Sequence, residues 1–284
     1  MNKIKSYFDL MRLSNPYPIL IILYPTFWGL FSASSVEKVP VKYIFVFLMG
    51  GIIMRTVGCI FNDIFDRNFD IQVERTKSRP IAQKKIKVLH AIIVAICLLF
   101  IAFFLVLELN KFSIILSIIG IILTLIYPLT KRFFPIPQLF LGFTFNFGII
   151  LSYAALNNEL NLDTWVLYIA AIFWTLSYDT IYALADKQCD EKLKLQSSAI
   201  IFGKNAMTMV LVFQICMILC LLIFGCIKNL KNIFYIGIIT VLIIFIYQYL
   251  IYPKEKKCAE HHIERFNNNH WFGLLILVGI ILGQ

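Results

Sequence analysis

Nine apolar runs, the last of them short, limit this chain to one class of fold, a bundle of membrane-spanning helices. A helix needs about 20 apolar residues to cross the hydrocarbon core of a bilayer, and inside lipid it satisfies its own backbone hydrogen bonds. We therefore predict an all-α polytopic membrane protein, with residues 1–284 as a single domain. The runs cover residues 17–35, 43–66, 88–109, 112–130, 135–156, 164–186, 206–227, 231–252 and 270–283.

The composition supports this prediction and excludes a soluble domain. Hydrophobic residues make up 60% of the chain and charged residues 15%, whereas soluble domains carry about 25% charged residues. The net charge of +10 comes from basic residues in short loops between the runs, which indicates an orientation signal and no nucleic-acid partner. The seven cysteines lie mostly inside the runs and form no CxxC pair, so we expect buried thiols without a disulfide or metal role.

The basic residues are distributed unequally between the two sides of the membrane. The N-terminal segment and the loops after the second, fourth, sixth and eighth runs hold 20 Lys and Arg residues, while the other four loops hold 5. Cytoplasmic loops are the ones enriched in Lys and Arg. We therefore predict a cytoplasmic N-terminus, cytoplasmic loops at 67–87 and 187–204, and, with nine spans, a C-terminus outside.

A polar stretch at residues 55–82 interrupts the apolar pattern. It reads RTVGCIFNDIFDRNFDIQVERTKSRPIA, and Asn62, Asp66 and Asp70 are spaced so that they share one face of a helix. A charged side chain near the hydrocarbon costs about 2.5 to 3.5 kcal/mol on insertion scales. Because anchoring a helix in lipid does not need such residues, we interpret this face as a candidate functional site.

A second acidic helix end follows in the other half of the chain. Asp186 and Asp190 are four residues apart at the end of the run 164–186, and Asp179 lies one heptad before Asp186 on nearly the same face. The loops that follow the two acidic helix ends are both predicted on the cytoplasmic side. The two acidic helix ends should therefore reach the cytoplasmic surface at matching depth.

The two acidic faces carry oxygen ligands of the kind that Mg²⁺ prefers. Mg²⁺ usually binds through one or two carboxylates plus substrate phosphates, so two opposed acidic faces fit a diphosphate held between metal ions. An ion or proton pathway is the alternative, because intramembrane acids mark those as well. A cation cluster favours the diphosphate, since an ion pathway has little use for it. This cluster follows the first acidic face at Arg67, Arg75, Lys77 and Arg79.

Residues near the acids carry weaker signals. Arg55 would lie inside the bilayer, where a buried arginine must be paired, so we expect pairing with an acid first and substrate contact second. Tyr178 and Tyr182 flank the second acidic face and are candidates for lining a cavity, where ring faces would stabilise a carbocation. Lys131 and Arg132 close a loop on the cytoplasmic side, where such pairs mostly signal topology.

The two acidic segments resemble the signatures of a known family. NDIFDRNFD followed by ERTKSRPI is similar to the first signature of the UbiA superfamily of intramembrane prenyltransferases, and YDTIYALADKQCDEKLKLQSSAIIFG is similar to the second. Together with LMRLSNPYPILIILYPTFWGL and YPLTKRFFPIPQLFLGFTFNFGI, the second signature looks most like that of the 4-hydroxybenzoate polyprenyltransferases of ubiquinone biosynthesis. The resemblance covers nearly the whole chain and weakens after about residue 205.

The resemblance implies a nine-helix fold around a central cavity that is capped on the cytoplasmic side of a bacterial inner membrane. Asp63 and Asp179 also match the family pattern, without a defined role. By the same pattern, Mg²⁺ and the diphosphate are held by Asn62, Asp66, Asp70, Asp186 and Asp190, and the four of these that are aspartates are the predicted catalytic residues.

The basic residues complete the predicted substrate site. Arg75, Lys77 and Arg79 match the basic loop of the family, and Arg132 matches an arginine that meets the aromatic acceptor. We therefore predict an enzyme that uses Mg²⁺ to transfer a polyprenyl group from polyprenyl diphosphate to the ring carbon of 4-hydroxybenzoate ortho to the hydroxyl, without an obligate protein partner. The alternatives are another acceptor, such as haem or a naphthoate, and, from another class, an ion-coupled transporter.

Overall fold

The computed structural model of the protein describes residues 3–14, 16–35, 38–252 and 258–284. In this part of the chain the regular elements are helices, apart from turns. The α-helices are α1 (Lys3–Met11), α2 (Tyr17–Ala33), α3 (Val41–Asp70), α4 (Val88–Leu107), α5 (Lys111–Thr130), α6 (Pro137–Phe145), α7 (Phe147–Asn157), α8 (Leu162–Lys192), α9 (Ser198–Phe202), α10 (Ala206–Lys228), α11 (Asn232–Ile251) and α12 (Ala259–Gly283).

The membrane-spanning pattern expected from the sequence is confirmed. Eight helical segments in the described residues are long and apolar enough to cross a bilayer, with α6 and α7 counted as one segment and α9 joined to α10. Helix α2 is apolar as well but only 17 residues long. Together these segments correspond to the predicted apolar runs. The chain is therefore an all-α integral membrane protein.

Three helices extend beyond the apolar runs that predict them. α3 reaches Asp70 and α8 reaches Lys192, so both acidic motifs lie on continuous helices. α12 begins at Ala259, well before the predicted run, because its polar first turns pack against the neighbouring helix. There Arg265 donates a hydrogen bond to the carbonyl oxygen of Gln248 at 2.8 Å. A helix continues past its last apolar residue wherever tertiary contacts of this kind support it.

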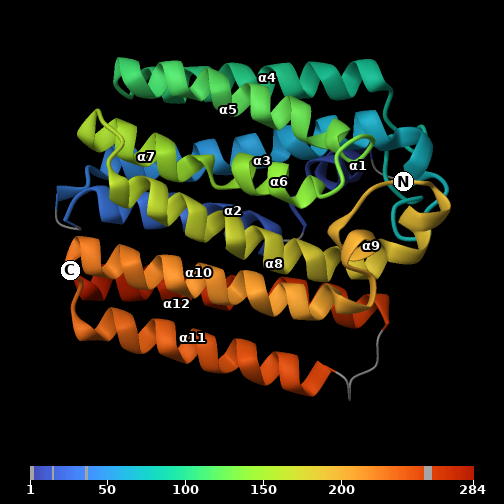
Figure 1. The fold of residues 1–284 in the computed structure, drawn as a ribbon. Helices are drawn as coiled ribbons and strands as arrows, with labels where there is room; N and C mark the ends of the chain where they lie inside the picture. Colours follow the sequence, from blue (N-terminus) through green and yellow to red (C-terminus); the bar gives the residue numbers. More distant parts are fainter. Residues whose placement is uncertain (1–2, 15, 36–37, 253–257) are drawn as a thin grey trace.

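The helices lie side by side in one bundle, with α4 and α11 at its outer edges (Figure 1). α1, the loop 71–87 and α9 lie at one end of the bundle, which we call the loop end, and α12 finishes at the opposite end (Figure 1). A backbone hydrogen bond joins two connections at the loop end, from the amide of Gln196 to the carbonyl oxygen of Lys131 at 3.0 Å. The loops 67–87 and 187–204, which the sequence predicts on one side of the membrane, lie at this same end (Figure 1).

The core of the bundle forms where α8 packs against α2, α10 and α12. Trp28 of α2 and Trp174 of α8 are fully buried, with their rings 5.1 Å apart. The indole nitrogen of Trp28 donates to the carbonyl oxygen of Gly273 at 3.0 Å. A Cβ atom on Gly273 would lie 2.7 Å from the Trp174 ring, so the absence of a side chain lets α12 approach. Small residues serve close helix packing in membranes in this way.

Candidate active site

The acidic motifs occupy the ends of α3 and α8 at the loop end of the bundle. Asp63, Asp66 and Asp70 of α3 are 1%, 9% and 6% exposed, although they carry ionisable groups. A buried carboxylate is costly unless it is paired with a cation or binds a metal. The surroundings of these side chains therefore decide what the site can do.

The loop 71–87 supplies the first cation, Arg79. Its Nη1 atom lies 2.8 Å from Asp70 Oδ2 and 3.2 Å from Asp63 Oδ1, so one guanidinium bridges two carboxylates of α3. The same loop is held against α3 by Thr76, whose hydroxyl donates to the carbonyl oxygen of Asp70 at 3.0 Å. The end of α3 and the following loop therefore form one unit.

Arg75 connects the same loop to α8. It donates two hydrogen bonds to Asp186, one of them 2.9 Å from Nε to Oδ1. The guanidinium also lies 5.0 Å from the centre of the Tyr182 ring, within cation-π range. Two hydrogen bonds from one arginine to one carboxylate fix the relative position of the two groups. Through this contact the basic loop that follows α3 is joined to the acidic end of α8, which lies in the other half of the sequence.

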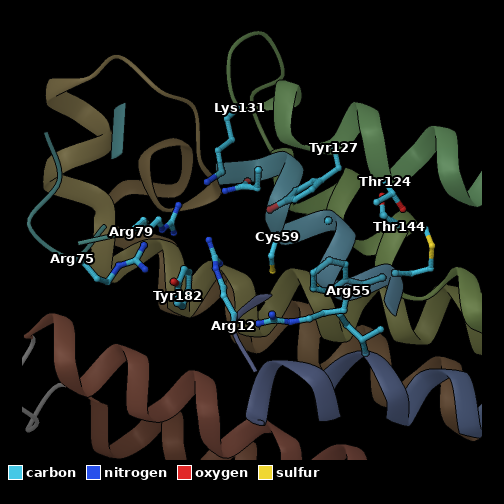
Figure 2. Close-up of a pocket in the computed structure, with 15 residues that line it drawn as sticks. Arg12, Arg55, Cys59, Arg75, Arg79, Thr124, Tyr127, Lys131, Thr144 and Tyr182 are labelled. Atoms are coloured by element: carbon cyan, nitrogen blue, oxygen red, sulfur yellow. The ribbon is translucent and has the colours of Figure 1, made fainter. Parts of the chain in front are cut away.

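These side chains border a cavity with a volume of about 160 Å³. Figure 2 shows Arg75 and Arg79 on the left, Lys131 and Tyr127 above, and Arg12 extending from below. The predicted substrate residues Asn62, Arg75 and Arg79 are among its lining residues. The full lining comprises Arg12, Ile22, Met54, Arg55, Gly58, Cys59, Asn62, Arg75, Arg79, Thr124, Tyr127, Lys131, Thr144, Phe145 and Tyr182.

Two predicted substrate residues lie away from this lining. Lys77 is exposed, and its ammonium lies 2.6 Å from Glu74 in the same loop. Arg132 is exposed as well and donates to the carbonyl oxygen of Phe65 at 2.8 Å, with its guanidinium 5.6 Å from the centre of the Phe69 ring. In this arrangement Arg132 holds the loop after α5 against the outside of α3.

The two tyrosines that flank the acidic face of α8, Tyr178 and Tyr182, differ in their surroundings. Tyr178 is buried in the core, where its hydroxyl lies 3.1 Å from the hydroxyl of Thr175 and its ring packs on Trp174 and Phe266. Tyr182, one turn later, lines the cavity, as we expected. The predicted substrate residue Tyr178 is thus placed in the helix packing behind the site.

Lys131 is a candidate substrate-binding residue, although from the sequence we interpreted it as a signal for membrane topology. Its side chain lines the cavity from the end of α5 (Figure 2). Burial by itself would lower the pKa of Lys131, but nearby carboxylates of both acidic motifs, Asp66 and Asp190 foremost, outweigh burial and raise the pKa. The ammonium is therefore charged at neutral pH. One available signal was spacing, because Tyr127 and Lys131 are four residues apart and face the same way.

Two further arginines line the cavity from the side of α1. Arg12 is hydrogen-bonded to Asp63. Arg55 of α3 donates to the carbonyl oxygen of Met11 at 3.4 Å. We expected an acid to pair with Arg55, but its hydrogen bond in the described residues goes to a backbone carbonyl, because Asp63 is engaged by Arg12 and Arg79. The N-terminal segment contributes a site residue that the sequence analysis did not identify.

The predicted metal ligands offer only oxygen donors, which suit Mg²⁺. No group of three or more His, Cys, Asp or Glu side chains in the described residues is placed to hold a metal ion by itself. Mg²⁺ usually binds through one or two carboxylates together with waters and substrate phosphates. Asp70 and Asp186 contact arginines in this arrangement, while Asp66 and Asp190 act electrostatically on Lys131. The donor set therefore fits a metal that arrives with a phosphate ligand.

A second, apolar cavity of about 280 Å³ adjoins the first. It extends between α2, α3, α4, α5 and α7, and its lining is almost entirely hydrophobic. The residues that line both cavities are Ile22, Met54, Thr124, Thr144 and Phe145. The site can therefore accept a ligand with a charged head at the loop end and an apolar chain within the bundle.

Comparison with known proteins agrees with this geometry. The sequence matches the UbiA prenyltransferase family over residues 22–273. A protein of Francisella tularensis subsp. mediasiatica named 4-hydroxybenzoate octaprenyltransferase is 42% identical over 281 residues, and the alignment covers 98% of both chains.

Solved structures share the fold. The apo structure of a UbiA homolog from Aeropyrum pernix K1 has a TM-score of 0.79 at 22% identity, covering 93% of this chain and 96% of that one. A UbiA homolog from Archaeoglobus fulgidus, solved bound to GPP and Mg²⁺, has a TM-score of 0.74 at 15% identity, covering 97% and 99%. At these identities the likeness establishes the architecture of the bundle.

Proposed function

Because the chain belongs to the UbiA prenyltransferase family, we propose that it transfers a polyprenyl group from a polyprenyl diphosphate to 4-hydroxybenzoate, at the ring carbon ortho to the hydroxyl. The observation that carries this proposal is a cavity lined by five cationic side chains that adjoins an apolar cavity. A polyprenyl diphosphate has the same division between a charged head and an apolar chain. The name of the Francisella relative supports the choice of acceptor.

The diphosphate would bind among the cations of the loop end. Arg75 and Arg79 come from the loop 71–87 and Lys131 from the end of α5, so the head would be held from two directions (Figure 2). Arginine forks match phosphate oxygens in bidentate geometry, and the lysine adds a point charge. Binding would exchange the contacts that these arginines make with Asp70 and Asp186 for contacts with phosphate.

We propose Mg²⁺ as the cofactor, held by the side chains of both acidic motifs. When bound, it would neutralise negative charge that develops on the departing diphosphate. The Archaeoglobus fulgidus homolog solved with GPP and Mg²⁺ supports this choice. The proposed ligands are Asn62, Asp66, Asp70, Asp186 and Asp190.

The reaction requires the bond between the allylic carbon and the diphosphate oxygen to break, with the electron pair leaving on oxygen. Fixed cations aimed at that oxygen stabilise the developing charge without reorganisation. The remaining allylic cation would meet the aromatic rings of Tyr127 and Tyr182, which line the cavity. A desolvated cation-π contact contributes roughly 2 kcal/mol. The surrounding helices would have to exclude water, which would otherwise trap the cation.

Arg55 is suited to hold the acceptor. It lies on α3 next to residues that line both cavities, and its guanidinium contacts a backbone carbonyl instead of a carboxylate. An incoming carboxylate of 4-hydroxybenzoate would therefore find a buried cation whose direct hydrogen bond is to a backbone carbonyl. The ring carbon ortho to the hydroxyl would then form the new carbon–carbon bond, and the ring would pass its proton to the released diphosphate, which restores aromaticity.

The apolar cavity would receive the prenyl chain, which continues into lipid. Each buried CH₂ group contributes about 0.8 kcal/mol to staying in an apolar phase. Placement in a bacterial inner membrane, with the site on the cytoplasmic face, and a role in ubiquinone biosynthesis are parts of the same proposal.

An acceptor assay tests this function. Membranes containing the protein, given a prenyl diphosphate and Mg²⁺, should prenylate 4-hydroxybenzoate in preference to a naphthoate or haem acceptor. Intact protein that prenylates another acceptor and ignores 4-hydroxybenzoate would refute the acceptor. An ion-coupled transporter would instead move ions without releasing diphosphate, so diphosphate release in the absence of any ion gradient separates the two classes.

A further inference from the structure

The helix α1 ends in a conformation that usually requires glycine. The amide of Arg12 donates to the carbonyl oxygen of Asp9 at 3.2 Å, and the amide of Leu13 donates to that of Phe8 at 3.3 Å. These two bonds form a Schellman motif, whose first residue after the helix is left-handed and most often glycine. Here that residue is Arg12, with a φ of 52°.

An arginine in this position is unfavourable on local grounds. Its Cβ crowds the backbone in the left-handed region, and its side chain, unlike that of Asn or Asp, cannot compensate by a short local hydrogen bond. Strained residues of this kind persist where the surrounding structure fixes them, and they cluster at functional sites. With the left-handed conformation at Arg12, its side chain extends into the cavity (Figure 2).

The helix that carries Arg12 is fixed against α3. Leu10 is fully buried and belongs to the same hydrophobic cluster as Ile60 and Ile64 of α3, which flank Asp63 in the sequence. Arg55 holds the last carbonyl of α1 from the other side. Arg12 therefore reaches the site with a defined position and not as a flexible surface side chain.

We propose that Arg12 is a substrate-binding residue that contacts the diphosphate of the prenyl donor. Arg12 and Arg79 share one carboxylate, that of Asp63, so the two guanidinium groups are held next to each other at the cavity. Arg79 is already a proposed diphosphate ligand. Asp63 is then a positioning residue for two arginines, which gives a role to a motif aspartate that the sequence left unassigned. This inference rests on the proposed function for its donor.

The substitution Arg12→Gly separates binding from folding. Glycine suits the left-handed backbone and Asp63 keeps its contact with Arg79, so the variant should still fold, and its thermal midpoint in detergent measures how far these two effects offset the lost contact with Asp63. Loss of a charge-assisted contact should weaken the binding of geranyl diphosphate with Mg²⁺ by about tenfold or more. Arg12→Lys, which keeps the charge, should restore part of the affinity. Binding is measured by titration calorimetry without any acceptor.

Lys84→Gly is the matched control. Lys84 is a basic residue with a φ of 57° in the loop 71–87, and it is exposed outside the cavity. Its replacement should leave the affinity for geranyl diphosphate unchanged. Wild-type affinity in Arg12→Gly would overturn the role of Arg12 alone, as would a rise confined to the KM for the acceptor. A wild-type protein that does not bind geranyl diphosphate would overturn the proposed donor as well.

Discussion

The charged residues of the site form ion pairs, and two of them, Asp63 and Arg79, have two partners each. Arg79 contacts Asp63 and Asp70, and Asp63 contacts Arg12 and Arg79. Removing one partner of a buried ion pair is strongly destabilising, by about 3 to 5 kcal/mol, because it leaves a buried charge uncompensated. Asp66 differs, because its electrostatic partners are more distant cations and not a direct arginine contact. It is therefore the aspartate at which function can be tested with least disturbance to the fold.

Asp66→Asn should lower turnover by about 100-fold or more, as expected for a group that organises charge at the reaction centre, while the protein still inserts and keeps its thermal midpoint. The control is Asp163→Asn, at the far end of α8. Asp163 is a buried aspartate whose carboxylate accepts from the Tyr153 hydroxyl at 2.9 Å and lies 3.5 Å from Lys228. That variant should lose stability and retain turnover per folded molecule. Near-normal turnover in Asp66→Asn would remove Asp66 from the proposed metal site.

Arg55→Gln should raise the KM for 4-hydroxybenzoate by about tenfold or more, because a charge-assisted hydrogen bond to the carboxylate is lost. Glutamine keeps a donor for the carbonyl oxygen of Met11, so the contact with α1 can survive. The affinity for geranyl diphosphate should not change. Lys42→Gln is the control, since Lys42 is exposed and pairs with Glu108 away from the site. A changed donor affinity with an unchanged acceptor KM would contradict the assignment of Arg55.

At the scale of the helices, hydrophobic runs predicted the spans because each run of sufficient length must be buried in lipid or in the bundle. They could not predict which polar side chains face inward. Lys131 and Arg132 are adjacent and equally basic, yet one lines the cavity and the other lies outside on α3. Successive residues on a helix point about 100° apart, and only the packing of neighbouring helices decides which direction is inside.

The same limit applies to Arg12 and to α12. Arg12 precedes the first apolar run, and its role depends on the left-handed end of α1 and on Asp63, which is far away in the sequence. The sequence of the polar start of α12 is typical of a loop. In the structure this segment is helical and is held by a hydrogen bond from Arg265 to Gln248, a tertiary contact that the local sequence does not indicate. The acidic motifs could be predicted because a charged side chain in an apolar helix costs free energy, whatever the positions of the neighbouring helices.

Gly50 of α3 provides a test of the apolar cavity. It lines this cavity, and a Cβ atom at this position would meet nothing within 4 Å. Gly50→Leu should therefore fill space that the prenyl chain needs, lowering kcat/KM for a long polyprenyl diphosphate more than for geranyl diphosphate. Gly237→Leu is the matched control on α11, because that glycine also has open space around it but does not line either cavity. Equal losses for both donors would argue against a chain-binding role.

The whole molecule is polarised along the bundle, with the cationic cavity at the loop end and α12 finishing at the opposite end (Figure 1). The excess of Lys and Arg at the loop end predicts that this end is cytoplasmic. An alkaline phosphatase fused after Gln284 should therefore be active outside the cytoplasm, and one fused after Lys194 should be inactive. The reverse pattern would place the site on the outer face and contradict the predicted orientation.

Product analysis with the purified protein tests whether it transfers a prenyl group to 4-hydroxybenzoate with Mg²⁺. Protein in detergent is given geranyl diphosphate and 4-hydroxybenzoate, with Mg²⁺ or with a chelator, and both products are quantified. We expect one equivalent of diphosphate for each molecule of 4-hydroxybenzoate that gains a carbon-bound geranyl group ortho to the hydroxyl, and none of either product in the chelator. Diphosphate release without this product, or the same product at an undiminished rate in the chelator, would contradict this expectation.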